Sequence, residues 1–301
     1  MGLNYTYGRG FYEEYNDLWY TQNISFGSET SYSYLQIPEN ITTNLSVNET
    51  ENISQKWLDN QYYVMTLGMN YQDAETTLNF GGLASRYFGD HFGILIWGQQ
   101  LGETIPNHRF YENQGIKTEG STFIKISQKL NSAWNAFVDL QLRGINYDVN
   151  GKVAGPSNFE VADDFLFFNP KAGLTYNFTD TQKLYLSYAK AQREPNRTDY
   201  ENGSPKPEKL NDFEFGWRVK KEKMQAQANI YWMEYNDQLV LTGAIDAVGA
   251  PIRQNVGESR RMGLEVEVQW QLLDQLIWKP NFALSSNKNL DFYFKLDGVL
   301  E

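Results

Sequence analysis

The chain contains eleven stretches in which apolar and polar residues alternate with a period of two. Successive side chains of an extended chain point to opposite faces, so this period is typical of β-strands that have one apolar face. In the clearest stretch, residues 262–270, Met, Leu, Val, Val and Trp alternate with Gly, Glu, Glu and Gln. Residues 63–71 and 134–143 follow the same pattern. The sequence therefore predicts an all-β protein with a large antiparallel, up-and-down sheet.

The connections between the predicted strands alternate between short and long. We expect strands near residues 2–12, 62–71, 74–83, 118–128, 133–145, 170–178, 183–191, 211–220, 224–235, 260–271 and 275–285. The long connections are predicted at residues 13–61, 84–117, 146–169, 192–210 and 236–259. Transmembrane β-barrels have short turns on the periplasmic side and longer loops outside the cell, so this alternation favours such a barrel.

Several aromatic residues are predicted on the apolar face close to the short turns: Trp134, Tyr176, Phe178, Trp270 and Trp278. Amphipathic rings concentrate where a membrane meets water, so their placement agrees with a membrane barrel. A large soluble sandwich is the alternative, because its strands alternate too. Soluble sheets rarely combine strands of this length with connections this unequal, and we therefore prefer the transmembrane barrel.

The composition argues against several other classes of protein. A net charge of −11 disfavours nucleic-acid binding, which needs a basic face. No apolar run reaches the roughly 18 residues of a transmembrane helix. The sequence has no cysteine, and its two histidines do not form an H-E-x-x-H motif. We therefore expect no enzymatic activity, no catalytic residues, no metal site and no cofactor.

Three segments resemble motifs in the barrel of TonB-dependent outer-membrane receptors. They are N-P-K-A-G-L-T-Y at residues 169–176 with K-L-Y-L-S-Y-A at 183–189, K-P-E-K-L-N-D-F-E-F-G at 206–216, and N-V-G-E-S-R-R-M-G-L-E-V-E at 255–267. In its overall pattern the first half resembles ferric-siderophore receptors of Bacteroidetes. Bacterial barrels have even strand numbers and eleven is odd, so we expect residues 1–301 to be part of a barrel domain of about 22 strands, truncated at both ends and without the plug domain.

The resemblance implies a function in active transport. Receptors of this family import ferric siderophores or similar scarce nutrients across the outer membrane of Gram-negative bacteria, with no chemistry on the ligand. The implied partners are the ligand, outer-membrane lipid and the inner-membrane TonB complex, which acts through an N-terminal region expected upstream of this chain. A glycan or cobalamin importer of the same superfamily and a soluble all-β ligand-binding protein are the alternatives.

Individual motif residues also have a physical interpretation. Pro207 precedes a strand, where its missing N–H does no harm. Gly216 and Gly263 have the parity of the polar face and suit a close approach or a bend of the sheet. Glu265 and Glu267 share that predicted face. They either solvate a polar interior or, as the resemblance implies, face the plug.

The predicted loop at residues 84–117 is the main candidate for a ligand site. It is dense in aromatic and basic residues, namely Tyr87, Phe88, His91, Phe92, Trp97, His108, Arg109, Phe110 and Tyr111. Rings can stack on planar or apolar parts of a ligand, and Arg109 can pair with an anionic chelate. The alternative is packing within the loop, since long loops form small cores of their own. Our hypothesis assigns ligand contact to Tyr87, Phe88, His91, Phe92, Trp97, His108 and Arg109.

Overall fold

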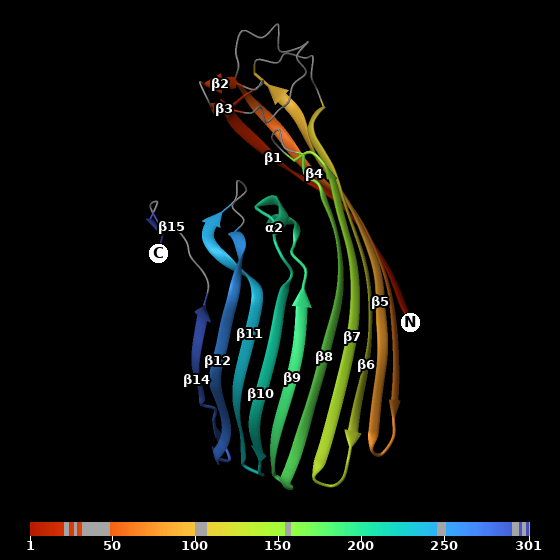
Figure 1. The fold of residues 1–301 in the computed structure, drawn as a ribbon, viewed down its shortest axis with the longest axis vertical. Coiled ribbons are helices and arrows are strands. Elements are labelled where there is room, and N and C mark those ends of the chain that lie inside the picture. Colours follow the sequence, from red (N-terminus) through yellow and green to blue (C-terminus); the bar gives the residue numbers. More distant parts are fainter. Residues whose placement is uncertain are drawn as a thin grey trace. The chain divides into compact units, whose positions relative to one another are not determined.

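The computed structural model describes residues 1–20, 24–26, 29–31, 49–99, 107–153, 158–245, 251–290, 295–296 and 299–300, and most of them form β-strands (Figure 1). The long strands are β1 (Gly2–Tyr20), β4 (Glu49–Gln72), β5 (Thr76–Gly98), β6 (His108–Lys129), β7 (Trp134–Gly151), β8 (Val161–Thr179), β9 (Gln182–Arg193), β10 (Glu208–Lys220), β11 (Met224–Ile245), β12 (Pro251–Leu273) and β14 (Asn281–Asn289). The shorter elements are β2 (Ile24–Phe26), β3 (Glu29–Ser31), β13 (Leu276–Trp278), β15 (Lys295–Leu296), β16 (Val299–Leu300) and the helix α2 (Arg197–Glu201).

Consecutive long strands are hydrogen-bonded neighbours in one sheet. The strand order is β1-β4-β5-β6-β7-β8-β9-β10-β11-β12-β13, and β14 also pairs with β12. This order confirms the predicted up-and-down, all-β architecture. The predicted strand at residues 275–285 appears as β13 and β14, which continue one register on β12 across Lys279 and Pro280. No helix in the described part of the chain is long and apolar enough to span a membrane.

The short connections lie where the alternation predicts them, at residues 73–75, 130–133, 180–181, 221–223 and 274–275. In the first of these, the side chain of Asp73 accepts hydrogen bonds from the backbone N–H groups of Glu75 and Thr76 at 2.9 and 2.8 Å. An Asx turn uses the same contacts. The two bonds hold the pKa of the Asp73 carboxyl below its ordinary value. Asn131 accepts two backbone N–H groups in the same way between β6 and β7.

The long connections are shorter than predicted, because the strands extend past the alternating segments. β5 continues to Gly98 and β6 begins at His108, so the predicted loop at 84–117 is wrong for residues 84–98 and 108–117. The connections predicted at 13–61, 146–169 and 236–259 are shortened in the same way. Hydrogen bonding between strands needs no apolar face, so a strand continues where the sequence pattern stops.

The chain forms two compact units, which are described separately. Unit 1 consists of residues 1–67, 83–120 and 144–165, and unit 2 of residues 68–82, 121–143 and 166–301. Buried apolar side chains include Leu95, Phe110 and Val149 in unit 1 and Val219 and Val256 in unit 2. Among the described residues, far more large apolar side chains are exposed than buried. Neither unit encloses most of its apolar residues.

Candidate ligand site

The strand registers of unit 2 separate apolar and polar side chains onto two faces of the sheet. Residues directly opposite each other on neighbouring strands point to the same face. On the apolar face, one row from β8 to β14 contains Leu174, Leu186, Phe215, Ile230, Leu264 and Leu284. On the polar face, one row contains Asn177, Lys183, Arg218, Gln227, Glu267 and Asn281. The predicted two faces of residues 262–270 are therefore confirmed.

The apolar face is open to solvent in this chain. Leu186, Ile230 and Leu284 are 55%, 54% and 64% exposed, although each belongs to a continuous row of large apolar side chains. A soluble protein rarely exposes a contiguous apolar patch larger than about 600 Å² without a binding partner. The described part of the chain therefore leaves this apolar face uncovered.

The aromatic residues predicted beside the short turns lie at that edge of the apolar face. Trp134 stacks on Tyr176 with ring centroids 4.6 Å apart, and the Tyr176 ring lies 6.4 Å from that of Phe178. Trp270 of β12 is directly opposite Trp278 of β13. All five are at the short-turn end of their strands, so the predicted group of aromatic side chains is present.

On the polar face, tyrosine rings cover glycines of the neighbouring strand. The ring of Tyr185 on β9 lies so close to Gly216 on β10 that an added Cβ would overlap it. The Tyr185 hydroxyl donates a hydrogen bond of 2.9 Å to Oδ1 of Asn229 on β11. Tyr231 covers Gly263 in the same way. The close approach expected at these two motif glycines is thus made by side-chain rings, as in the aromatic rescue of strand glycines.

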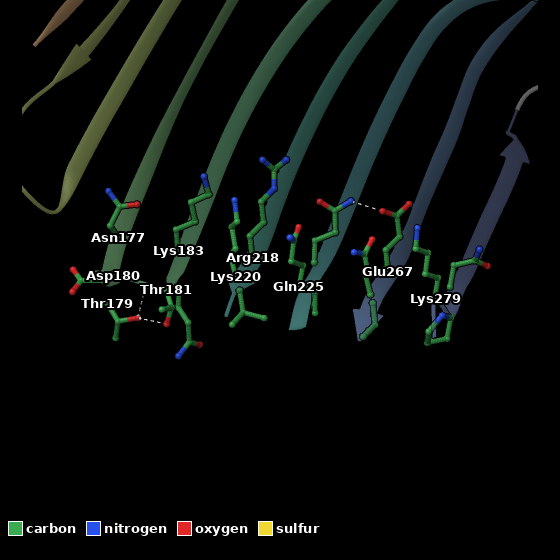
Figure 2. Close-up of a pocket in the computed structure, with 18 residues that line it drawn as sticks. Asn177, Thr179, Asp180, Thr181, Lys183, Arg218, Lys220, Gln225, Glu267 and Lys279 are labelled. Carbon is green, nitrogen blue, oxygen red and sulfur yellow. Dashed lines mark hydrogen bonds between the residues drawn. The ribbon is translucent and has the colours of Figure 1, made fainter. Parts of the chain in front are cut away.

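A cavity of about 590 Å³ lies on the polar face beside the short turns (Figure 2). Its charged lining residues are Lys183, Arg218, Lys220, Lys279, Asp180 and Glu267. Four cations and two anions give this lining a net charge of +2, whereas the whole chain carries −11. The sequence alone does not indicate this site, because its residues come together only through the registers of β8 to β14. The row of opposed cations is visible only once those registers are known.

The residues hypothesised to contact a ligand lie on strands of unit 1 and not in a loop. On β5 are Tyr87, Phe88, His91, Phe92 and Trp97, and on β6 are His108 and Arg109. Adjacent positions of a strand point to opposite faces, so neighbours in sequence do not form one cluster here. Their contacts divide them accordingly.

Three of these residues make ring contacts on one face of unit 1. Phe92 stacks on Trp57 of β4, with ring centroids 6.0 Å apart. The guanidinium carbon of Arg109 lies 4.2 Å from the centroid of the Phe92 ring. Phe88 lies 6.3 Å from Tyr63, which shares the parity of Trp57 on β4. A cation over a ring gains roughly 0.5–1 kcal/mol at an exposed site, which helps to order Arg109.

Tyr87 lies on the opposite face. Its hydroxyl donates a hydrogen bond of 2.8 Å to Oδ1 of Asn60, whose parity on β4 differs from that of Trp57. Further along β5, His91 is half-buried and Trp97 is 44% exposed. The structure therefore does not bring the predicted residues into a single cluster.

A second cavity, of about 570 Å³, lies beside the start of β6 in unit 1. It is lined by His108, Arg109, Phe110, Tyr111, Glu112, Asn150, Gly151, Lys152, Asn158 and Glu160. Nη1 of Arg109 lies 2.7 Å from Oε1 of Glu112. A guanidinium has five N–H donors, so Arg109 can hold this carboxylate and still bind an anionic group. Two of the hypothesised ligand contacts, His108 and Arg109, therefore line this cavity.

The segment between β9 and β10 is held by its own capping contacts and by side chains of β12. Asn196 and Asp199 form a capping box at the start of α2, with bonds of 2.8 and 3.0 Å. The buried carboxylate of Asp199 also accepts hydrogen bonds of 2.9 and 2.8 Å from Arg253 of β12. The Asn255 side chain bonds the backbone N–H and C=O of Lys206 at 2.7 and 3.0 Å. The K-P-E and N-x-G motifs thus meet in space.

Several solved structures share this fold. The copper transporter OprC has a TM-score of 0.61 and 18% identity, over 79% of this chain and 38% of its own. The siderophore receptor PiuA from Acinetobacter baumannii has a TM-score of 0.57 and 13% identity, over 99% of this chain and 46% of its own. The alcaligin outer-membrane receptor FauA from Bordetella pertussis has a TM-score of 0.53 and 14% identity, over 80% of this chain and 42% of its own. The chain spans less than half the length of each.

Almost the whole sequence matches the model of one protein family. Among curated proteins, none matches it. The family described as "TonB dependent receptor-like, beta-barrel" matches residues 1–297. Its members are transport receptors and not enzymes. Because the match covers almost every residue, and the sheet order and two-faced registers agree with it, this chain belongs to the TonB-dependent receptor β-barrel family.

Proposed function

We propose that this chain is part of the barrel of an outer-membrane receptor that imports a ferric siderophore or a similar scarce nutrient, of the type found in Bacteroidetes. The observation that carries the proposal is the exposed apolar face of unit 2, with aromatic residues along its short-turn edge. Lipid accommodates such a face, and water does not. Membership of the family and the likeness to a siderophore receptor support the transport role.

In this proposal the apolar face contacts outer-membrane lipid of a Gram-negative cell, and the polar face lines the lumen. The short turns lie in the periplasm, and the opposite ends of the strands reach the cell surface. Residues 1–301 supply about half of a barrel of about 22 strands. Other parts of the protein supply the remaining strands, the plug and the region on which the TonB complex acts.

For ligand capture we propose the aromatic and basic residues of unit 1. Arg109 lies over Phe92 and lines the cavity beside His108. Its free guanidinium donors suit the oxyanions of a chelate, and the rings on the same face suit its planar parts. Phe88 extends that face, whereas Tyr87, His91 and Trp97 add contacts elsewhere along β5.

The experiment is uptake by cells that lack their own siderophore receptors and produce the full-length protein. Labelled ferric siderophores are supplied with and without an uncoupler that removes the energy for transport. Energy-dependent iron uptake that requires the receptor supports the proposal. Energy-dependent uptake of copper, cobalamin or a glycan with no uptake of iron would refute the siderophore assignment while keeping the barrel. A protein that stays out of the membrane fraction would refute both.

A further inference from the structure

We propose that the lipid-facing side of unit 2 carries a basic belt that binds the phosphate groups of glycolipid in the outer leaflet of the membrane. The belt consists of two rows of residues on the apolar-face parity, at the ends of the strands away from the short turns. One row contains Lys190, Asn211, Glu234, Arg260 and Lys288, and the next contains Gln192, Lys209, Asn236 and Glu258. Four cations and two anions give the belt a net charge of +2, whereas the whole chain carries −11. The inference rests on the proposed placement of the chain in the outer membrane.

An aromatic row separates the basic belt from the large apolar side chains. Phe213 of β10 lies directly opposite Tyr188 of β9 and Trp232 of β11, and the rings of Tyr188 and Phe213 are 4.9 Å apart. The polar atoms of this row are directed toward the belt. The Tyr188 hydroxyl donates a hydrogen bond of 2.9 Å to Oδ1 of Asn211, and Nε1 of Trp232 donates one of 3.0 Å to Oε1 of Glu234. Aromatic girdles flank the apolar band of a transmembrane barrel on both sides, so this row marks the boundary opposite the short turns.

The depth of the belt agrees with this boundary. Arg260 is ten residues from Trp270, or ~33 Å along β12 at ~3.3 Å per residue. With the strand tilted by ~40°, this is ~25 Å along the membrane normal, about the full height of the apolar band. Arg260 therefore lies where the hydrocarbon ends and the headgroups begin. In a Gram-negative outer membrane, the headgroups of the outer leaflet are sugars that carry phosphates.

The aromatic row also orients the guanidinium of Arg260. Its central carbon lies 4.8 Å from the centroid of the Trp232 ring, and Nη2 lies 3.5 Å from Oε1 of Glu234. The side chain of Arg260 is still 39% exposed. A guanidinium has five N–H donors, so one long carboxylate contact leaves donors for a phosphate. Because the ring restricts its rotamers, Arg260 loses less entropy when it binds.

Two lysines extend the belt over β9 and β10. Lys190 and Lys209 are diagonal neighbours, since Lys190 lies directly opposite Asn211, two residues from Lys209. The residues opposite Lys209 on the two flanking strands are the neutral amides Gln192 and Asn236. Long lysine side chains place their apolar stems against apolar surface and their charged ends in the polar layer. The charge of the belt therefore favours an anionic partner, and its place on the lipid-facing side makes that partner a lipid.

The test measures the affinity of the purified full-length receptor, in micelles of a neutral detergent, for fluorescently labelled lipid A that carries two phosphates. The comparison ligand is the same labelled lipid A after enzymatic removal of its phosphates. Each cation near a membrane surface strengthens the binding of anionic lipid about fivefold, so the phosphorylated form should bind at least about tenfold more tightly. Equal affinity for the two forms would overturn the proposal, and this comparison needs no variant.

Lys190→Gln combined with Lys209→Gln should weaken the binding of phosphorylated lipid A about 25-fold, or about fivefold for each charge removed. If the double variant does not assemble, Lys209→Gln alone should weaken binding about fivefold. Affinity that is unchanged in the variant would overturn the proposal.

The matched control removes two charges from the polar face. Lys171 of β8 lies directly opposite Ala189, next in sequence to Lys190, so it lies at the depth of the belt on the other side of the sheet. Nζ of Lys125 lies 5.5 Å from the centroid of the Phe137 ring, which covers Gly173 on the polar face. Lys125→Gln combined with Lys171→Gln should leave the affinity nearly unchanged. Equal weakening by the two double variants would overturn the proposal, because net charge and not the belt would then set the affinity.

The outcome is separable from that of the proposed function, because the measurement involves no transport. A receptor that takes up iron and does not prefer phosphorylated lipid A would refute the basic belt alone. A receptor that stays out of the membrane fraction would refute both.

Discussion

An arginine at Val266 should destabilise the protein far more than an arginine at Glu267, its neighbour on β12. Val266 lies on the apolar face between Ala228 and Phe282, and Glu267 lies on the polar face between Gln227 and Asn281. The two positions share a strand and differ by one residue. The same substitution therefore compares the two faces directly.

The expected cost follows from the depth of Val266. It is four residues from Trp270, or ~13 Å along the strand at ~3.3 Å per residue. With the strand tilted by ~40°, Val266 lies ~10 Å from the aromatic edge of an apolar band ~25 Å tall, close to its middle. An arginine there costs about 2–4 kcal/mol. At Glu267 the main loss is the hydrogen bond from Gln227, about 1 kcal/mol.

The assay is reversible unfolding of the full-length receptor in lipid vesicles by denaturant, with assembly in the outer membrane measured in parallel. Val266→Arg should lower the free energy of unfolding by at least about 1 kcal/mol more than Glu267→Arg, and it should reduce the assembled fraction. Equal losses from the two variants would show that the faces have the same surroundings. The assignment of lipid and lumen would then be wrong.

Three further predictions concern single contacts. Gly216→Val should destabilise the sheet by about 1–3 kcal/mol, because the valine side chain would overlap the Tyr185 ring. Adding Tyr185→Ala should recover part of the lost unfolding free energy. If the double variant instead loses the sum of the two single losses, the ring contact is contradicted. Arg109→Ala should weaken ligand binding about tenfold or more. It should leave the free energy of unfolding nearly unchanged, since the ion pair of Arg109 with Glu112 is about half exposed. Titration of the ligand onto wild type and variant at matched expression tests this, and unchanged affinity would leave Arg109 with a purely structural role. Asp73 has a folded pKa below its unfolded value of about 3.9, so its stabilising contribution is present above that pH and is lost as pH falls through the folded pKa. The difference in unfolding free energy between wild type and Asp73→Ala should therefore shrink as the pH falls. A difference that grows in acid would contradict the lowered pKa of Asp73.

The fold was largely predictable because a half-apolar strand has to repeat its pattern every two residues. The short turns were also predictable, since residues such as Asp73 and Asn131 stabilise a tight turn with their own side chains. The far ends of the strands were not. Beyond the alternating segment apolar side chains lie on both faces of β5, as buried Phe92 and Leu95 show, so the strand extends to Gly98 with no signal in the alternation.

The candidate ligand residues were predictable as a composition and not as an arrangement. Their density of rings and cations is visible in the sequence. Their distribution is not, because a loop would have let them gather, whereas strand geometry sends Tyr87 and Phe92 to opposite faces. Arg109 over Phe92 joins two strands, and no local pattern encodes that contact.

The sequence by itself determined the all-β class, the two faces and the short turns, since all three follow from interactions within a few residues of the chain. Only the tertiary structure decided which residues of different strands stand opposite each other. Register depends on pairing along whole strands, and a shift of one residue would move every side chain to the other face. The pairing of Arg218 with Lys183 and the cover of Gly216 by Tyr185 arise from register alone, so neither can be read from the separate segments.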